Sequence, residues 1–255
     1  TVRETVLSIT TVDDMQHKIM YPLLQALMQT TSLGVTESGL EILEEDKYYT
    51  IVGNHRDIVL DSALLQMVFL SKGVKTSGIT FGDNLLVSDL IRIIAKTNKL
   101  FITYRTTGMR EFLEHAKRLS TYIRYQINVL HQSVWIAQHN GRAKDGNDKT
   151  DQGILKMLNM SGSGDFVKDF EELNILPLAI SYEYEPCGFL KALEIYKTRR
   201  GPYVKKEDED FNSIITGLTQ PKGHIHLSFC APISKGELEK AAQERRPVRV
   251  EFAED

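Results

Sequence analysis

Residues 48–70 read YYTIVGNHRDIVLDSALLQMVFL and predict a strand, a short turn and a helix in succession. The first five residues are mostly β-branched or aromatic, as in strands, and apolar residues recur at helical spacing from Ile58 onwards. His55 therefore follows the end of a strand, with Asp57 and Asp61 close behind it. A strand end fixes the backbone and a carboxylate orients the imidazole, which suits a general base. The alternative is structural: Asp57 caps the helix and His55 is its neighbour.

The rest of the chain alternates strand-like and helix-like runs. We expect strands at 48–53, 75–81, 99–103, 133–138, 175–183 and 223–229, and helices at 58–71, 86–96, 107–130, 150–160, 165–173 and 207–217. This alternation predicts an α/β fold with a largely parallel mixed sheet flanked by helices. In such sheets, ligands bind at the carboxyl ends of the strands. Because His55, Arg105 and residues 140–144 each follow an expected strand, we expect them to gather at one sheet edge.

The first part of the chain predicts a helical element before the sheet. Apolar residues from Met15 to Leu33 recur at helical spacing, and Pro22 within this run predicts a kink or two helices. We expect this element to pack on the core; an amphipathic contact with lipid is the alternative. The expected division is an N-terminal helical element over residues 1–40 and an α/β domain carrying the site over residues 41–255.

Five short segments, in order along the chain, resemble the four sequence blocks of the glycerolipid acyltransferases. That family includes the glycerol-3-phosphate and 1-acylglycerol-3-phosphate acyltransferases. The resemblance covers roughly residues 48 to 182 and implies that the α/β domain is an acyltransferase domain. The segments are GNHRDIVLDS at 53–62, GDNL at 82–85, LFITYR at 100–105, NGRAKDG at 140–146 and ILPLAI at 175–180.

The first block implies the catalytic residues. In the family, a histidine deprotonates a substrate hydroxyl, which attacks an acyl thioester, and an aspartate follows the histidine after four residues. His55 matches the histidine, and Asp61 looks like the acid because a serine and an apolar run follow it. Five residues separate Asp61 from His55, however, and Asp57 is the alternative acid. The extra residue fits only if it lies in the turn before the helix.

The second and third blocks imply a site for an anionic acceptor. Arg105 matches the family arginine that contributes to binding the acceptor phosphate, since a guanidinium pairs with phosphate oxygens bidentately. Its alternative role is that of an ordinary surface arginine. Where the family carries a glutamate, His139 or Asn140 stands here. The substrate-binding residues that the resemblance implies are Arg56, Arg105, Asn140, Gly141, and the paired cations Arg142 and Lys144.

The resemblance implies an O-acyltransferase of phospholipid biosynthesis. It would move a fatty acyl group from acyl-CoA or acyl carrier protein to a hydroxyl of a glycerol phosphate or lysophospholipid. The acyl thioester is a co-substrate, and the resemblance implies neither a cofactor nor a metal. Because the third block departs from the family pattern, two alternatives stay open. One is a phosphate-free acceptor such as an acylated amino acid, and the other is a catalytically weak relative that binds lipids.

Composition bounds the setting of the protein. With 255 residues, 42% of them hydrophobic, the chain can bury a sizeable core. A net charge of -3 argues against general nucleic-acid binding, whereas residues 72–124 hold ten Lys or Arg and four acids, which suits an anionic substrate or membrane surface. Two cysteines make no disulfide framework, and we recognise no signal peptide or membrane-spanning run. We therefore expect a cytoplasmic protein, peripheral on the inner face of the membrane.

Overall fold

The computed structural model describes residues 2–86, 89–104, 108–204, 206 and 208–244. Within this part, seven strands form one mixed sheet in the order β1-β7-β6-β2-β5-β3-β4. All neighbouring strands are parallel except β6 and β7, so the predicted α/β fold with a largely parallel mixed sheet is confirmed. The strands are β1 (Gly34–Ser38), β2 (Thr50–Gly53), β3 (Gly78–Gly82), β4 (Leu100–Thr103), β5 (Val134–Ala137), β6 (Ile175–Tyr182) and β7 (His224–Phe229).

Strand β1 was not predicted from the sequence pattern. It lies at the edge of the sheet, where it pairs with β7 alone. Three of its five residues, Thr36, Glu37 and Ser38, are polar, so the strand lacks the apolar run that marks the buried strands.

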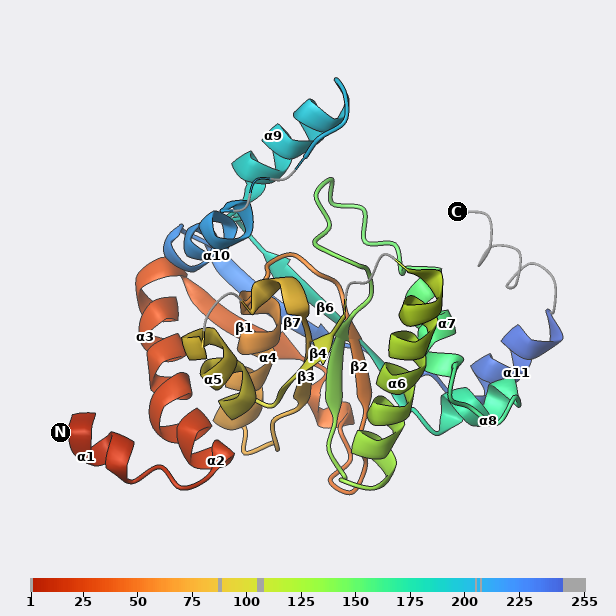
Figure 1. Ribbon diagram of the computed structural model, residues 1–255. Helices are drawn as coiled ribbons and strands as arrows, with labels where there is room; N and C mark the ends of the chain where they lie inside the picture. Colours follow the sequence, from red (N-terminus) through yellow and green to blue (C-terminus); the bar gives the residue numbers. More distant parts are fainter. Residues whose placement is uncertain (1, 87–88, 105–107, 205, 207, 245–255) are drawn as a thin grey trace.

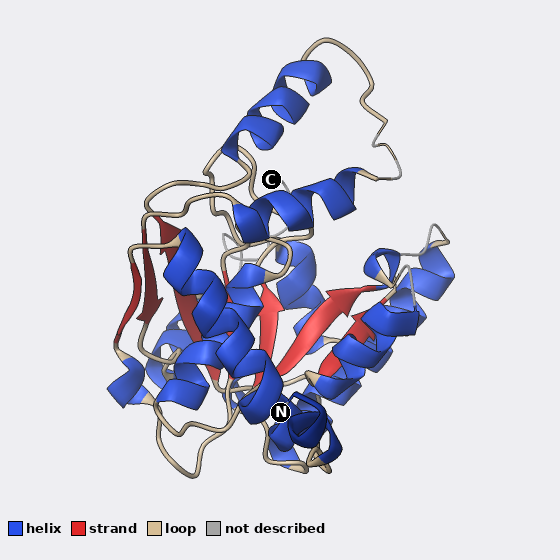
Figure 2. Ribbon diagram, turned by 90° about the vertical axis from the view of Figure 1, so that its left-hand side faces the viewer, coloured by secondary structure: helices blue, strands red, loops and turns tan. Residues whose placement is uncertain are grey.

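Helices cover both faces of the sheet, as Figure 2 shows. On one face, α3 (Tyr21–Thr31) and α4 (Leu60–Ser71) bury apolar side chains against the strands. On the other face lie α6 (Met109–Asn128), α7 (Gln152–Asn159), α8 (Phe166–Glu171) and α11 (Lys235–Gln243). Strand β2 sits between these layers: Ile51 joins the first core and Val52 the second. Its four residues are therefore all buried, and β2 holds the following turn on a rigid base.

The N-terminal helix runs through residues 12–31 as three successive segments, α2 (Val12–Met15), a π-helical segment (Gln16–Met20) and α3. The expected irregularity near Pro22 thus takes the form of a π-helical stretch just before the proline. Met28 is buried, and Tyr21, Leu24 and Leu27 pack against the first core. The helix therefore covers the sheet beside α4 (Figure 1).

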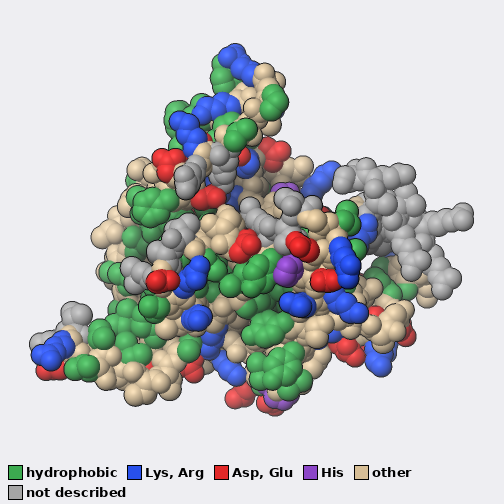
Figure 3. All heavy atoms as spheres, in the orientation of Figure 1, with side chains coloured by type: hydrophobic (Ala, Val, Ile, Leu, Met, Phe, Trp, Pro, Cys, Tyr) green, Lys and Arg blue, Asp and Glu red, His purple; other side chains and the backbone are tan. Residues whose placement is uncertain are grey.

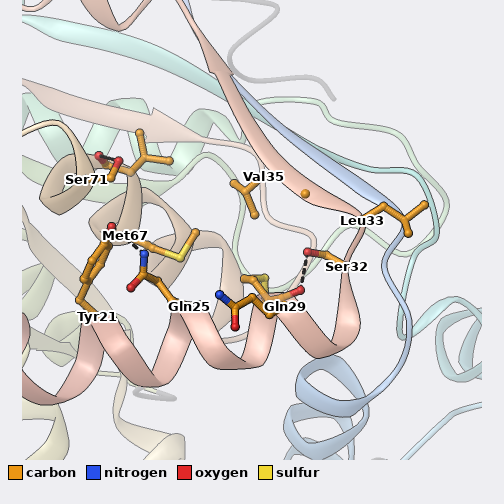
Figure 4. Close-up of a pocket in the computed structure, with 11 residues that line it drawn as sticks. Tyr21, Gln25, Gln29, Ser32, Leu33, Val35, Met67 and Ser71 are labelled. Carbon is orange, nitrogen blue, oxygen red and sulfur yellow. Dashed lines mark hydrogen bonds between the residues drawn. The ribbon is translucent and has the colours of Figure 1, made fainter.

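A cavity of about 460 Å³ lies between α3, α4 and β1 (Figure 4). Its lining includes Tyr21 and Met28 of α3 and Met67 and Ser71 from the C-terminal half of α4. His55 precedes the other end of α4, and none of the expected site residues that the structure describes lines the cavity. This cavity is therefore separate from the candidate site.

The remaining helices include two that the sequence predicted and three that it did not. The expected helices at 86–96 and 207–217 correspond to α5 (Asp89–Thr97) and α10 (Glu209–Thr219). Three helices were not predicted, namely α1 (Val2–Leu7), α9 (Gly188–Thr198) and α11. Two short 3-10 turns are formed by Leu40–Ile42 and Asp83–Leu85. Among the described residues, no helix combines the length and apolar character needed to cross a membrane.

Candidate active site

The turn between β2 and α4 carries the candidate site. It begins at Asn54, whose side chain replaces a strand partner: its Oδ1 accepts from the Ile180 N–H at 2.7 Å and its Nδ2 donates to the Ile180 carbonyl at 3.0 Å. These two bonds tie the turn to β6 just beyond the end of β2. His55 therefore leaves the sheet from a fixed point at the carboxyl ends of the parallel strands.

Helix α4 begins at Leu60 rather than at the expected Ile58. Asp57 lies in the turn before this start, and its Oδ1 accepts from the backbone N–H groups of Val59 and Leu60, both at 2.9 Å. Asp57 thus acts as a capping side chain, because it pairs backbone donors at the start of the helix that have no partner within the helix. The His55–Asp61 spacing exceeds the family pattern by one residue. The residues between them lie mostly in the turn before the helix, and Asp61 occupies the first turn of the helix.

His55 and Asp61 form the central pair of the site. The distance from His55 Nδ1 to Asp61 Oδ2 is 3.0 Å, and the Asp61 side chain is fully buried whereas that of His55 is 15% exposed. An ionised Asp61 accepts from Nδ1–H, which leaves Nε2 as the ring nitrogen that can take a substrate proton. The arrangement has the geometry of a general base with a carboxylate that orients it.

Three further donors hold the Asp61 carboxylate. Oδ2 accepts from the backbone N–H of Arg56 at 2.7 Å and of Asp57 at 2.9 Å. Oδ1 accepts from the Tyr182 hydroxyl at 2.9 Å. Burial, followed by the negative charges of Asp61 and Asp57, raises the pKa of Tyr182 well above its usual value, so the phenol stays protonated and donates. These donors replace the water that a buried carboxylate loses.

Asp57 has a different environment from Asp61. Burial, with the Asp61 charge as the second cause, raises the pKa of the Asp57 carboxyl. Its Oδ2 is buried and has no hydrogen-bond partner among the described residues. Asp57 is therefore placed as a helix cap beside the site and does not contact the imidazole in the way that Asp61 does.

The indole of Trp135 forms one wall behind the imidazole. The two rings meet edge to face with centroids 6.0 Å apart. Trp135 lies on β5, next to β2, and a side chain at Gly53 would bring its Cβ to 2.7 Å from the indole Nε1. Glycine at position 53 therefore lets the tryptophan pack directly beneath the turn that carries His55.

The loop between β5 and α7, residues 138–151, lies over the site. The Ala143 N–H donates to the His55 carbonyl at 2.8 Å, and Asp148 ion-pairs with Arg56 and accepts from Asn54 Nδ2 at 3.3 Å. Gln138 Nε2 in turn donates to the Asp148 carbonyl at 2.8 Å. The polar stretch Asp145 to Thr150 is thus attached to the turn that carries His55 through Asp148.

The expected acceptor-binding cations have different surroundings. Arg56 pairs with Asp148, and Lys144, which is exposed, pairs with Glu194 of α9. The side chain of Arg142 is half-buried, and its Nη1 has no hydrogen-bond partner among the described residues. Its positive charge opposes the rise in the pKa of Asp57, so Arg142 lies within electrostatic reach of the turn.

Two of the remaining expected residues are placed, and one is not. Asn140 is exposed on the loop, and Gly141 has φ +80°, a conformation that glycine adopts without strain. Arg105 lies outside the described residues. The expected meeting of Arg105 with Arg142 and Lys144 therefore stays a prediction.

The sequence pattern did not single out Tyr182, Lys191 or Asp148 as residues of this site. Tyr182 lies at the end of β6, a longer strand that continues beyond β2, and its position at the carboxyl end of an expected strand was the available signal. Lys191 of α9 is buried and donates to the Arg56 carbonyl at 2.6 Å, while Asp148 pairs with the Arg56 side chain.

Among the described residues, no group of three or more His, Cys, Asp or Glu side chains is placed to hold a metal ion.

Replacing Tyr182 with phenylalanine tests the support of Asp61. Tyr182→Phe removes one donor and leaves a buried carboxylate oxygen without it, so we expect kcat/KM for the catalysed reaction to fall about 10-fold. The protein should stay folded because the ring is retained. A pH–rate profile and kcat/KM measure the effect, and an unchanged profile with unchanged kcat/KM would show that the hydroxyl does not support the site.

Gly217 of α10 presses against Asp57. A methyl group at this position would lie 2.1 Å from Asp57 Oδ2. We therefore expect Gly217→Ala to destabilise the fold by about 1–3 kcal/mol, despite the better helix propensity of alanine. Thermal unfolding measures the effect. Gly236→Ala in α11 is the control, since its methyl would meet nothing within 4 Å and should raise Tm slightly; equal shifts for both variants would contradict the close contact.

Comparisons with known proteins place the fold. The sequence matches no family model, and a search of curated proteins finds no match. Among solved structures, the chain is similar to the crystal structure of the 1-acyl-sn-glycerophosphate acyltransferase PlsC from Thermotoga maritima. The TM-score is 0.55 with 13% sequence identity, and the similarity covers 100% of this chain and 88% of PlsC. The predicted resemblance to the glycerolipid acyltransferases is thus confirmed at the level of the fold.

Proposed function

We propose that this protein is an O-acyltransferase that moves a fatty acyl group from a thioester to a substrate hydroxyl, with His55 as the general base. The observation that carries the proposal is the 3.0 Å hydrogen bond between His55 and the buried Asp61. This pair stands at the carboxyl ends of the strands in a fold similar to that of PlsC. The alternative of a catalytically weak lipid-binding relative is disfavoured by this intact pair.

The chemistry follows from the position of the imidazole. The acceptor hydroxyl gives its proton to His55 Nε2 while its oxygen attacks the thioester carbonyl. The tetrahedral intermediate then collapses, the C–S bond breaks, and the departing thiolate takes the proton from the imidazolium. Asp61 stabilises the imidazolium between these steps, and Tyr182 with the Arg56 and Asp57 amides keeps Asp61 in place.

The acceptor that the resemblance favours is a glycerol phosphate or a lysophospholipid. Arg142 is the best placed of the described cations, since one buried guanidinium nitrogen still lacks a partner. Arg105 and Lys144 are proposed to complete the anion site, with Arg56, Asn140 and Gly141 around them. The donor is acyl-CoA or acyl carrier protein, and a peripheral position on the inner face of the membrane would bring the enzyme to a lipid acceptor.

A second candidate is transfer to a phosphate-free acceptor, such as an acylated amino acid. Two observations favour it. The positive charges of Arg56 and Lys144 are matched by the carboxylates of Asp148 and Glu194, which weakens their attraction for a phosphate. His139 or Asn140 also stands where the family has a glutamate, so the acceptor meets a different polar group.

Arg142 separates the two acceptors. If the acceptor carries a phosphate, Arg142→Ala should raise its KM about 10-fold or more and leave the KM of the thioester donor unchanged. If the acceptor carries no phosphate, the same change should barely alter its KM. Turnover of an acyl thioester with glycerol phosphate, a lysophospholipid and an acylated amino acid measures both. Lys156→Ala, at an exposed site on α7, is the matched control.

A further inference from the structure

Helix α9 and the segment after it, residues 188–204, form an arm that projects from the body (Figures 1 and 2). The arm rises beyond the carboxyl ends of the parallel strands, on the side where His55 lies. It is fastened near its base. Lys191 donates to the Arg56 carbonyl at 2.6 Å and pairs with Glu185 at 3.0 Å, and Glu194 pairs with Lys144. The arm is thus anchored to the catalytic turn and to the loop above it.

These anchors define which side of α9 faces the body. Successive residues turn by about 100° around a helix, so Lys191 and Glu194 share one side. Phe189, Leu193 and Tyr196, with Arg200 just beyond the helix, fall on the opposite side. Their exposures agree with this direction: Phe189 is 79% exposed, Leu193 37% and Tyr196 52%. An apolar stripe of the arm therefore points away from the active site.

Positive charge accompanies this stripe. Lys197, Arg199 and Arg200 are all exposed, and the sequence holds no acidic residue from 195 to 204. The Arg200 guanidinium lies 4.1 Å from the centre of the Tyr196 ring, and Val204 farther along is 84% exposed. Figure 3 shows basic and hydrophobic side chains together on the projecting part of the molecule. An isolated helix of this length gains little stability by itself, so a partner on its apolar face would stabilise it.

We propose that the arm docks on an anionic lipid membrane through Phe189, Leu193, Tyr196 and its three cations. Large apolar side chains next to exposed cations suit a lipid headgroup layer, where apolar groups enter the acyl boundary and cations meet anionic lipid. Tyr196 suits the interface because its ring is apolar and its hydroxyl is polar. An acidic protein partner would explain the exposed cations, but it would not explain why Phe189 is exposed beside them.

Docking of the arm would place the end of the sheet that carries the candidate active site near the membrane. The arm projects beyond the end of the sheet where β2 stops and the turn with His55 begins, and Lys191 connects the base of the arm to that turn. The inference deepens the proposed function and rests on it for the delivery of a lipid acceptor. Membrane binding itself can be measured without any turnover, so the two proposals can fail separately.

The test is sedimentation of the full 255-residue chain with vesicles. One set contains phosphatidylcholine alone, and the other contains phosphatidylcholine with roughly a third phosphatidylglycerol. We expect binding to the anionic set. Each cation near an anionic surface contributes about fivefold, so Lys197→Gln/Arg199→Gln/Arg200→Gln should weaken binding on the order of 100-fold. Phe189→Ser should weaken binding to the same vesicles about 10-fold.

Matched variants and outcomes keep the proposal falsifiable. Lys156→Gln/Lys168→Gln/Lys240→Gln removes three exposed cations from α7, α8 and α11 and should bind vesicles as the wild type does. Turnover of a short-chain, water-soluble substrate pair should be unchanged in the arm variants, which shows that they fold. Equal loss in both triple variants would overturn the proposal, because a general charge effect would then explain binding. The proposal would also be overturned if the wild-type protein did not bind the anionic vesicles. Self-association through the arm, or binding of an acidic carrier protein there, would then identify a different partner.

Discussion

Replacing His55 with alanine is expected to lower kcat/KM for acyl transfer by about 100- to 10,000-fold, the usual contribution of a general base. Without the imidazole, the acceptor hydroxyl loses the base that is proposed to take its proton. The fold should be retained because the His55 side chain is partly exposed and lies in a turn that Asn54 and Asp57 hold. Release of free thiol from the acyl donor measures the rate, and circular dichroism checks the fold.

His17→Ala is the matched control for His55→Ala. His17 is exposed on the π-helical segment of the N-terminal helix, away from the catalytic turn, and its loss should leave the rate unchanged. A His55→Ala protein that keeps most of its activity while folded would remove the proposed mechanism.

Replacing Asp61 with asparagine is expected to cost far more activity than replacing Asp57. An asparagine at 61 keeps one oxygen toward Nδ1 of His55, but it loses the charge that stabilises the imidazolium and fixes its tautomer. We expect a loss of about 100- to 10,000-fold, as in other histidine–aspartate pairs. Asp57→Asn should cost less than about 10-fold, because the amide oxygen still caps Val59 and Leu60.

The comparison of these two variants uses kcat/KM across a range of pH, with Tm as a check on folding. Both substitutions neutralise one buried carboxylate in the same turn, so each serves as the control for the other. Equal losses, or a greater loss at Asp57, would show that the carboxylate in contact with the imidazole is not the one that supports catalysis.

The central strand, turn and helix could be predicted because their pattern is local. Ile51 and Val52 pack into opposite cores, which explains why two adjacent residues of β2 are apolar, and α4 carries apolar residues on most sides because it is largely buried. Two starts were wrong by two residues each: β2 begins at Thr50 instead of 48, and α4 begins at Leu60 instead of 58. In the turn before α4, the Asp57 side chain accepts from the backbone two and three residues ahead, a local bond that hydrophobic periodicity does not reveal.

Long-range contacts explain what the sequence did not reveal. Tyr182 meets Asp61 across 121 positions because β6 lies beside β2 and extends past it, and a strand order cannot be read from local periodicity. Lys191 belongs to a helix that packs little of its surface on the core, so the sequence has no strong apolar pattern that predicts α9. The ion pairs of Arg56 and Lys144 depend in the same way on loop and arm positions.

The most direct measurement is a stoichiometric assay of acyl transfer by the wild-type protein and His55→Ala. Acyl-CoA and acyl carrier protein are supplied in turn as donors, with and without each hydroxyl acceptor, while free thiol and acylated acceptor are quantified together. We expect wild-type protein to release one thiol for each acylated acceptor, to release almost none without acceptor, and to lose both signals in His55→Ala. No transfer to any hydroxyl acceptor, or equal transfer by His55→Ala, would contradict the account.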